Sequence, residues 1–293
     1  MNTAGLVKCA GALVALAVCT ACGGSAPAPS TASLNATYIG RVLYVNGRPV
    51  TAARPPSLSA LTRYATILPD RRPRKKFEYI INNYGTYASI FDYPKSVAQI
   101  GTIENVGGQG CTNALYGYGK GIIWIVAGSN QIEEFKVPQT PIKTLSDDFP
   151  FSSSCAMDTS GDLAVGNLEG GQVIIFKNAT GSGTVYNTPL EAEYFDGYDN
   201  NGNLFADGFN GTGFALVELP KGSSTFKTIT TPNSVNFPGS VQWDGTYVTV
   251  FDQDANALYQ YTVSGTTATL QGTVTVSGAG DCAQTWIVKG LVY

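Results

Sequence analysis

The sequence predicts an all-β fold made of repeated four-stranded units, and three observations support this. The 293 residues include 34 Gly, 16 Tyr and 13 Phe but only 2 Met. Gly-containing turns separate runs of aromatic and β-branched residues, which favours strands over helices. Hydrophobic residues make up 43% of the chain, enough for a sizeable core. The third observation is a repeat.

Each repeat has an apolar strand after a Gly-containing turn, followed by a second strand that carries an aromatic or β-branched anchor. Successive anchors lie 41 or 44 residues apart, at Phe91, Phe135, Phe176, Val217 and Tyr261. Two further strands complete each period, and four strands in a period of this length indicate a β-propeller blade. Since a blade cannot bury both of its faces alone, neighbouring blades must pack around an axis.

The number of blades depends on how the two ends of the chain are used. The first unit starts at "FEYII" and lacks the strand that would precede it. We expect a six-bladed propeller whose last blade, starting at residues 282–288, is incomplete. In the alternative, the same residues close a five-bladed ring. A third option recruits residues 40–50 to fill the gap, because Asn46-Gly47 favours a tight hairpin.

The stretch "DNNGNLFADG", residues 199–208, resembles a calcium loop because Asp or Asn stands at its first, third and fifth positions. An EF-hand loop needs Gly at position six and Glu at position twelve, where this stretch continues to Asn210 and has its glycine, Gly202, at position four. A similar "DTSGD" occupies residues 158–162 of the preceding unit. We therefore interpret both as hairpin turns and predict no metal site.

The first 22 residues have the features of an export signal. One early cation, Lys8, precedes an apolar run at residues 10–18 that is too short to span a bilayer. The "CTAC" that ends at Cys22 resembles a bacterial lipoprotein cleavage box, so we expect lipidation of Cys22, with simple cleavage as the alternative. Residues 23–63 form a flexible linker with a possible short hairpin, and residues 64–293 form the propeller domain.

Composition excludes several kinds of chemistry. The chain has no His, which rules out imidazole bases, Ser-His-Asp triads and the histidine-dependent propeller lyases that inactivate antibiotics. The net charge of −3 gives no field that would attract nucleic acid. Cys111 and Cys155 are each expected to open the innermost strand of successive units, so export favours a disulfide between them over two free thiols.

Polar and aromatic side chains supply the remaining candidates. Oxygen ligands near strand ends could serve a metal-dependent hydrolase or lactonase at the channel mouth, namely Asn113, Asp196, Asp207, Asp252 and Asp281. No Glu recurs at the inner-strand starts, so we interpret these residues as polar caps of strands and turns. Tyrosines concentrate in the first two units and suit protein or glycan contacts, at Tyr79, Tyr84, Tyr87, Tyr93, Tyr116 and Tyr118.

Several stretches resemble propellers of the NHL and TolB-like type and, more closely, a family of exported bacterial six-bladed propeller lipoproteins. They include "KKFEYIINNYG", "GYDNNGNLFADG", "LVELPKGSSTF" and "FPGSVQWDGTYVTVFDQ", and the resemblance runs from about Tyr64 to Tyr293. It implies fold and location but no chemistry.

We therefore expect a non-enzymatic β-propeller that faces the periplasm or exterior, touches the membrane only through its lipid anchor, and binds a protein or polysaccharide at the cell surface. We predict no cofactor.

Overall fold

The computed structural model describes residues 36–39, 42–45, 48–49, 65–67, 76–81, 87–93, 99–104, 106, 109–111, 122–126, 131–136, 141–149, 151–276, 283–288 and 291–292. Across these ranges the fold is all-β, with a single short 3₁₀ turn, η1 (Lys177–Ala179). In the part of the chain that the structure describes, we find no helix with the length and apolar character needed to cross a bilayer.

Five antiparallel four-stranded sheets make up the body of the molecule. We name them sheets 1 to 5 in chain order. Sheet 1 has the order β4-β7-β6-β5, with β4 (Ala65–Ile67), β5 (Lys76–Ile81), β6 (Tyr87–Tyr93) and β7 (Gln99–Glu104). Sheet 2 contains β8 (Gln109–Cys111), β9 (Ile122–Val126), β10 (Gln131–Lys136) and β11 (Pro141–Ser146).

The other three sheets follow the order of the sequence. Sheet 3 contains β12 (Ser152–Met157), β13 (Leu163–Asn167), β14 (Gln172–Phe176) and β15 (Thr184–Asn187). Sheet 4 contains β16 (Ala192–Tyr198), β17 (Leu204–Phe209), β18 (Phe214–Leu219) and β19 (Lys227–Ile229). Sheet 5 contains β20 (Pro238–Trp243), β21 (Val248–Asp252), β22 (Ala257–Ser264) and β23 (Thr267–Thr275).

Two small sheets belong to the ends of the chain. β1 (Ala36–Ile39), β2 (Val42–Val45) and β3 (Arg48–Pro49) pair with one another in a sheet of their own. The hairpin predicted within residues 40–50 is therefore present, but it does not join sheet 1 to fill the gap. β24 (Ile287–Val288) pairs with β25 (Leu291–Val292). One strand was not predicted. β4 pairs with β7 at the outer edge of sheet 1, whereas the strand that sheet 1 lacks would lie at its inner edge.

The predicted repeat is confirmed by the position of the anchors. They fall on equivalent strands of the five sheets, β6, β10, β14, β18 and β22. The four whose side chains are described are fully buried, namely Phe135, Phe176, Val217 and Tyr261. The period of the sequence is therefore the period of the fold.

Hydrophobic contacts between consecutive sheets form the core. Alternate residues of one strand point to opposite faces, so Ile123 and Ile125 of β9 pack toward sheet 1 while Trp124 and Val126 pack toward sheet 3. The same arrangement recurs in β17, where Ala206 packs with sheet 3 and Phe205 packs with sheet 5. Each of these sheets is thus shielded on both faces by its neighbours, as expected for stacked blades.

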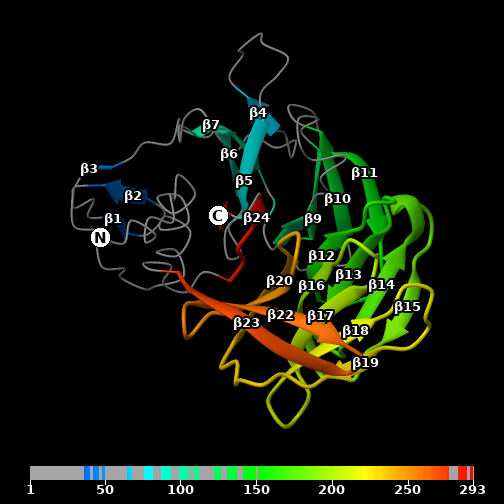
Figure 1. Cartoon of the computed structure of the whole chain (residues 1–293). Coiled ribbons are helices and arrows are strands. Elements are labelled where there is room, and N and C mark those ends of the chain that lie inside the picture. The colour runs from blue at the N-terminus through cyan, green and yellow to red at the C-terminus, as the bar shows by residue number, and fades with distance from the viewer. Residues whose placement is uncertain are drawn as a thin grey trace.

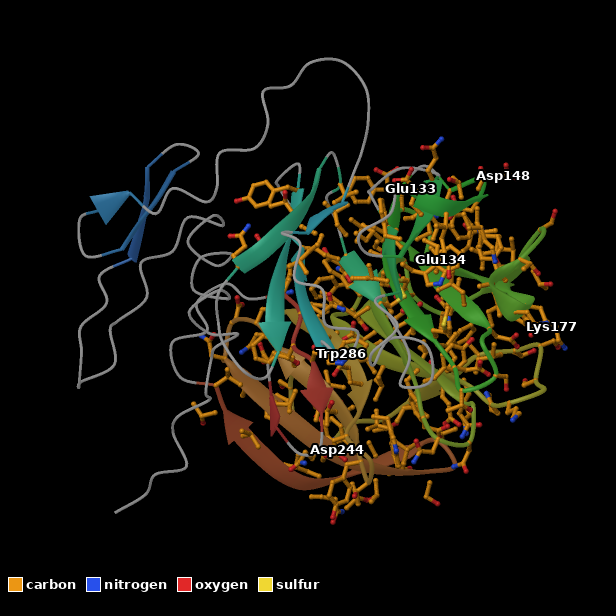
Figure 2. All side chains as sticks on the ribbon, turned by 90° about the horizontal axis from the view of Figure 1, so that it is seen from above. Glu133, Glu134, Asp148, Lys177, Asp244 and Trp286 are labelled. Atoms are coloured by element: carbon orange, nitrogen blue, oxygen red, sulfur yellow. A yellow bond between two sulfur atoms is a disulfide. The ribbon has the colours of Figure 1, made fainter. Side chains whose placement is uncertain are left out.

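The five sheets follow one another in an arc around the C-terminal segment that carries β24 (Figure 1). In the view from above, Trp286 of this segment lies in the middle of the molecule and Lys177 lies at its periphery (Figure 2). The segment runs beside β20: the Ser240 N–H donates to the Ala283 carbonyl, and the Ile287 N–H donates to the Gln242 side chain. Residues 283–287 therefore lie along the innermost strand of sheet 5.

The "DNNGN" stretch is a tight turn between β16 and β17. The Asp199 carboxylate accepts the N–H groups of Asn201 and Asn203 at 2.8 and 2.9 Å, and its second oxygen accepts the Asn203 side-chain amide. Gly202 has φ +83°, a conformation that favours glycine. The predicted turn is observed, and Asp158 closes the equivalent turn of sheet 3 in the same way.

Candidate functional site

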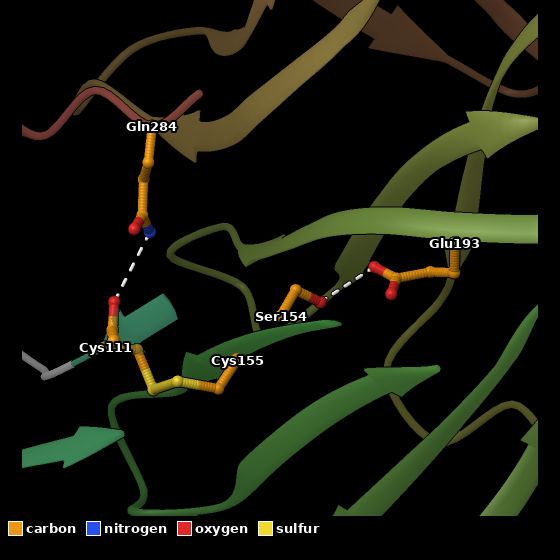
Figure 3. Close-up of a disulfide and its surroundings, with 6 residues drawn as sticks. Cys111, Ser154, Cys155, Glu193 and Gln284 are labelled. Atoms are coloured by element: carbon orange, nitrogen blue, oxygen red, sulfur yellow. Dashed lines mark hydrogen bonds between the residues drawn. A yellow bond between two sulfur atoms is a disulfide. The ribbon is translucent and has the colours of Figure 1, made fainter. Parts of the chain in front are cut away.

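Cysteine side chains link the inner strands of sheets 2 and 3. The structure has a disulfide between Cys111 and Cys155, whose Cα atoms lie 5.6 Å apart (Figure 3). Cys111 is the last described residue of β8 and Cys155 lies inside β12, rather than each opening its strand as we expected. The bridge lies next to a cluster of polar side chains at the starts of β12 and β16.

A β-bulge interrupts the first residues of each inner strand from β12 to β20. The register slips between Ser152 and Ser154, between Glu193 and Phe195, and between Pro238 and Val241. In a regular strand, consecutive side chains point to opposite faces of the sheet. A bulge bends the strand, so that consecutive side chains can point to the same face. Here it lets consecutive residues of β12 face the same group on β16.

That group is the Glu193 carboxylate, which is fully buried. The Ser153 hydroxyl lies 2.8 Å from Glu193 Oε2. The Ser154 hydroxyl lies 2.9 Å from Glu193 Oε1 (Figure 3). A Cβ atom at Gly166 of β13 would collide with the Glu193 carboxylate and with Ser154. Glycine at this position therefore provides the space that the carboxylate occupies.

Two further carboxylates, Asp196 of β16 and Asp207 of β17, are buried in the same sheet. None of their side-chain oxygens has a hydrogen-bond partner of normal geometry. Burial raises the pKa of both groups well above the usual value, and the charge of Glu193 raises both further. Among the described residues, the charged groups that act on the pKa of Asp196 and Asp207 are thus other carboxylates, and they raise it.

Burial also raises the pKa of Glu193, from 4.5 to about 7. The hydroxyls of Ser153 and Ser154 act in the opposite direction, because they donate to the carboxylate and stabilise its charged form. Glu193 can therefore change between its acid and its carboxylate near neutral pH, a property that is common in catalytic acids and bases.

Three aromatic rings lie at the same end of the strands. Tyr194 follows Glu193, Phe209 ends β17, and Phe237 precedes β20. The rings meet edge to face, with centroid distances of 5.5 Å from Tyr194 to each of the other two and 5.8 Å between Phe209 and Phe237. All three side chains are partly exposed. We call them the aromatic cluster.

The carboxylates predicted from the sequence separate into different groups. Asp196 and Asp207 join the buried cluster around Glu193. Asp252 is a turn cap, since its oxygens accept the N–H groups of Asn236, Phe237, Asp254 and Ala255. Asn113 and Asp281 lie outside the described residues, and so do Cys22, the predicted lipidation site, and the side chains of all the predicted tyrosines except Tyr87.

Glu193 was not among the residues predicted from the sequence. The available signal was the stretch "EAEYFDGYD", in which a Glu precedes the expected inner strand. We required a Glu that recurred from blade to blade, whereas Glu193 occurs in one sheet only. In the described part of the chain, no three or more Asp, Glu, Cys or His side chains are placed to hold a metal ion.

These features define a β-propeller of consecutive four-stranded sheets with a polar and aromatic cluster where the inner strands begin. No family model and no curated protein matches the sequence. Among solved structures, the chain is similar to a catalytically inactive virginiamycin B lyase from Staphylococcus aureus with quinupristin, at 12% identity and a TM-score of 0.51, covering 75% of this chain and 77% of that one.

A second similar structure is a streptogramin B lyase, at 14% identity and a TM-score of 0.46. That match covers 68% of this chain and 58% of the lyase. At 12% identity the similarity to the virginiamycin B lyase establishes the propeller fold alone.

Proposed function

We propose that this β-propeller binds a polysaccharide at the end of the molecule where β12, β16 and β20 begin. The observation that carries the proposal is the aromatic cluster of Tyr194, Phe209 and Phe237, partly exposed beside buried carboxyl and hydroxyl groups. Aromatic rings offer apolar faces to the C–H groups of a sugar, and the Tyr hydroxyl adds a polar tip.

Affinity electrophoresis through gels that contain dextran, xylan or alginate tests this proposal, together with pull-down on purified peptidoglycan. We expect one of these glycans to retard or capture the protein. Tyr194→Ala and Phe209→Ala should each weaken binding at least tenfold, because each removes a ring from the aromatic cluster. Tyr247→Ala is the matched control, since Tyr247 is a partly exposed aromatic residue in the hairpin at the opposite end of β20. Equal loss in the control variant would contradict the proposed site.

We propose further that the protein is exported and held at the cell envelope by a lipid on Cys22, with the linker up to residue 63 carrying the propeller. The signal-like first 22 residues support this, and so does a bridge between Cys111 and Cys155, which suits an oxidising compartment. Cys22→Ala should move the protein from the membrane fraction to the soluble exported fraction. Retention of the variant in the membrane fraction would contradict lipid anchoring at this residue.

The hydrogen bonds of the C-terminal segment favour a five-bladed ring. In such a ring, residues 283–287 are the inner strand of the first blade, so they must lie between the inner strands of sheets 5 and 2. They contact Ser240 and Gln242 on one side, and the Gln284 side chain donates to the Gly110 carbonyl of β8 on the other (Figure 3). Removal of residues 283–293 should then lower the unfolding temperature of the whole domain cooperatively.

The lyase activity named for the similar structures does not support a lyase function here. The two matches are too distant to carry a reaction, and the chain has no His. The metal-dependent hydrolase that we considered from the sequence also gains no specific support, because Asp252 is committed to a turn.

A further inference from the structure

A serine and a carboxylate are paired at the start of β12 in a way that the binding function does not require. Ser153 is the residue that the bulge inserts between Ser152 and Ser154, so it has no partner in the register with β13. Its side chain is partly exposed, and its hydroxyl lies 2.8 Å from Glu193 Oε2. A hydroxyl at this distance from a base, on an irregular strand segment, has the geometry of an activated nucleophile.

Glu193 is held in place as a base would be. Its second oxygen, Oε1, accepts the Ser154 hydroxyl at 2.9 Å, which fixes the orientation of the carboxylate. The side chain is fully buried, and the space it fills exists because residue 166 is a glycine. Burial makes the carboxylate more basic than one in water, and a base works best when its pKa is near the working pH.

We propose that Ser153 and Glu193 form a nucleophile–base dyad that hydrolyses carboxylic esters. This activity goes beyond glycan binding, does not depend on it, and departs from our expectation of a non-enzymatic protein. The chemistry is consistent with a chain without His, because the carboxylate takes the role that imidazole has in a Ser-His-Asp triad.

In the first step Ser153 Oγ attacks the carbonyl carbon of the ester, and its proton moves to Glu193 Oε2. The tetrahedral intermediate collapses, the bond to the alcohol oxygen breaks, and the leaving alkoxide takes the proton from Glu193. In the second step Glu193 removes a proton from water, the hydroxide attacks the acyl-serine, and the proton returns to Ser153 Oγ. The net reaction consumes ester and water and gives acid and alcohol, with the dyad restored.

The experiment uses the full-length protein, a fluorophosphonate probe and p-nitrophenyl acetate. We expect the probe to attach covalently to the peptide that contains Ser153, identified by mass spectrometry, and the acetate ester to be hydrolysed faster than in buffer. Ester turnover should rise with pH through about 7, because Glu193 must be ionised to accept the proton. An absence of labelling on the folded wild-type protein would overturn the proposal.

Three variants separate the dyad from a structural role. Ser153→Ala should abolish labelling and turnover, and Glu193→Gln should lower turnover by roughly 100-fold or more while the fold persists. Ser160→Ala is the matched control, since Ser160 is an exposed serine in the turn at the opposite end of β12, and it should keep the full activity. Equal loss in Ser153→Ala and Ser160→Ala, or labelling of another serine, would overturn the assignment.

If Ser153→Ala fails to fold, the labelling site on the wild-type protein still decides the question. Labelling and turnover are measured without any glycan, so their success or failure is independent of the outcome of the glycan-binding experiments.

Discussion

Replacement of Glu193 by Gln should change how the stability of the domain depends on pH. The carboxyl is fully buried, and its pKa is about 7 in the folded protein against 4.5 as the reference value. Because the folded-state pKa is raised, this group's contribution to stability is fully present below pH 4.5 and is lost as pH rises through about 7. Between these two pKa values the unfolded chain releases the proton while the folded protein retains it, so unfolding becomes more favourable as pH rises, and above about 7 the group is ionised in both states.

The size of the effect follows from the two pKa values. One pH unit corresponds to about 1.4 kcal/mol, so the difference between 4.5 and about 7 corresponds to about 3 kcal/mol. Gln keeps the shape of the side chain but cannot ionise. Relative to Glu193→Gln, the wild-type free energy of unfolding should therefore fall by about 3 kcal/mol between pH 4 and pH 8.

Urea denaturation followed by tryptophan fluorescence measures both proteins across this range. Asp196 and Asp207 stay in both proteins and also make the fold less stable as pH rises, and the Glu193 charge raises the pKa of both, so the difference between the two curves reports Glu193 together with its effect on these two carboxyls. Glu169→Gln is the control, because Glu169 is exposed, and its curve should parallel the wild type. If the wild-type and Glu193→Gln curves also run parallel, the raised pKa and the reasoning built on it are wrong.

Three further changes have expected results. Loss of the disulfide in a Cys111→Ser, Cys155→Ser double variant should lower the free energy of unfolding by about 4 kcal/mol, since the disulfide closes a loop of 44 residues. Unchanged denaturation midpoints, or free thiols in the oxidised wild type, would contradict this. Gly166→Ala should lower the melting temperature, because the added methyl group displaces the Glu193 carboxylate. A melting temperature equal to that of the wild type would show that the carboxylate can move to accommodate the methyl group. Asp199→Ala should lower the free energy of unfolding by about 1–2 kcal/mol, because the turn loses its hydrogen bonds, and added calcium should not change this difference. If calcium stabilises the wild type but not the variant, the turn binds metal.

Most of the fold could be predicted because blade periodicity is a local property of the chain. The anchors recur at nearly constant spacing, and each occupies the equivalent strand of its sheet. Turns such as the one closed by Asp199 also follow from short-range chemistry. The outer strand β4 was missed because its three residues, "ATI", carry no alternation long enough to detect.

The candidate site was only half predictable. Asp196 and Asp207 were selected as polar residues near strand ends, but their burial without partners depends on the faces of sheet 4 being covered by other sheets. Glu193 and Ser153 are separated by 40 residues in the sequence, and nothing local connects them. They meet because two β-bulges and a glycine on a third strand bring them together.

The sequence by itself determined the repeating strands, the hairpin turns, the absence of histidine chemistry and the expectation of export, because these depend on neighbouring residues and composition. Only the tertiary structure decided which side chains share a site. Contact across sheets depends on register, bulges and stacking, and a slip of one residue reverses the face to which every side chain points. For this reason Glu193, inconspicuous in the sequence, became the centre of the site, while Asp252 became a turn cap.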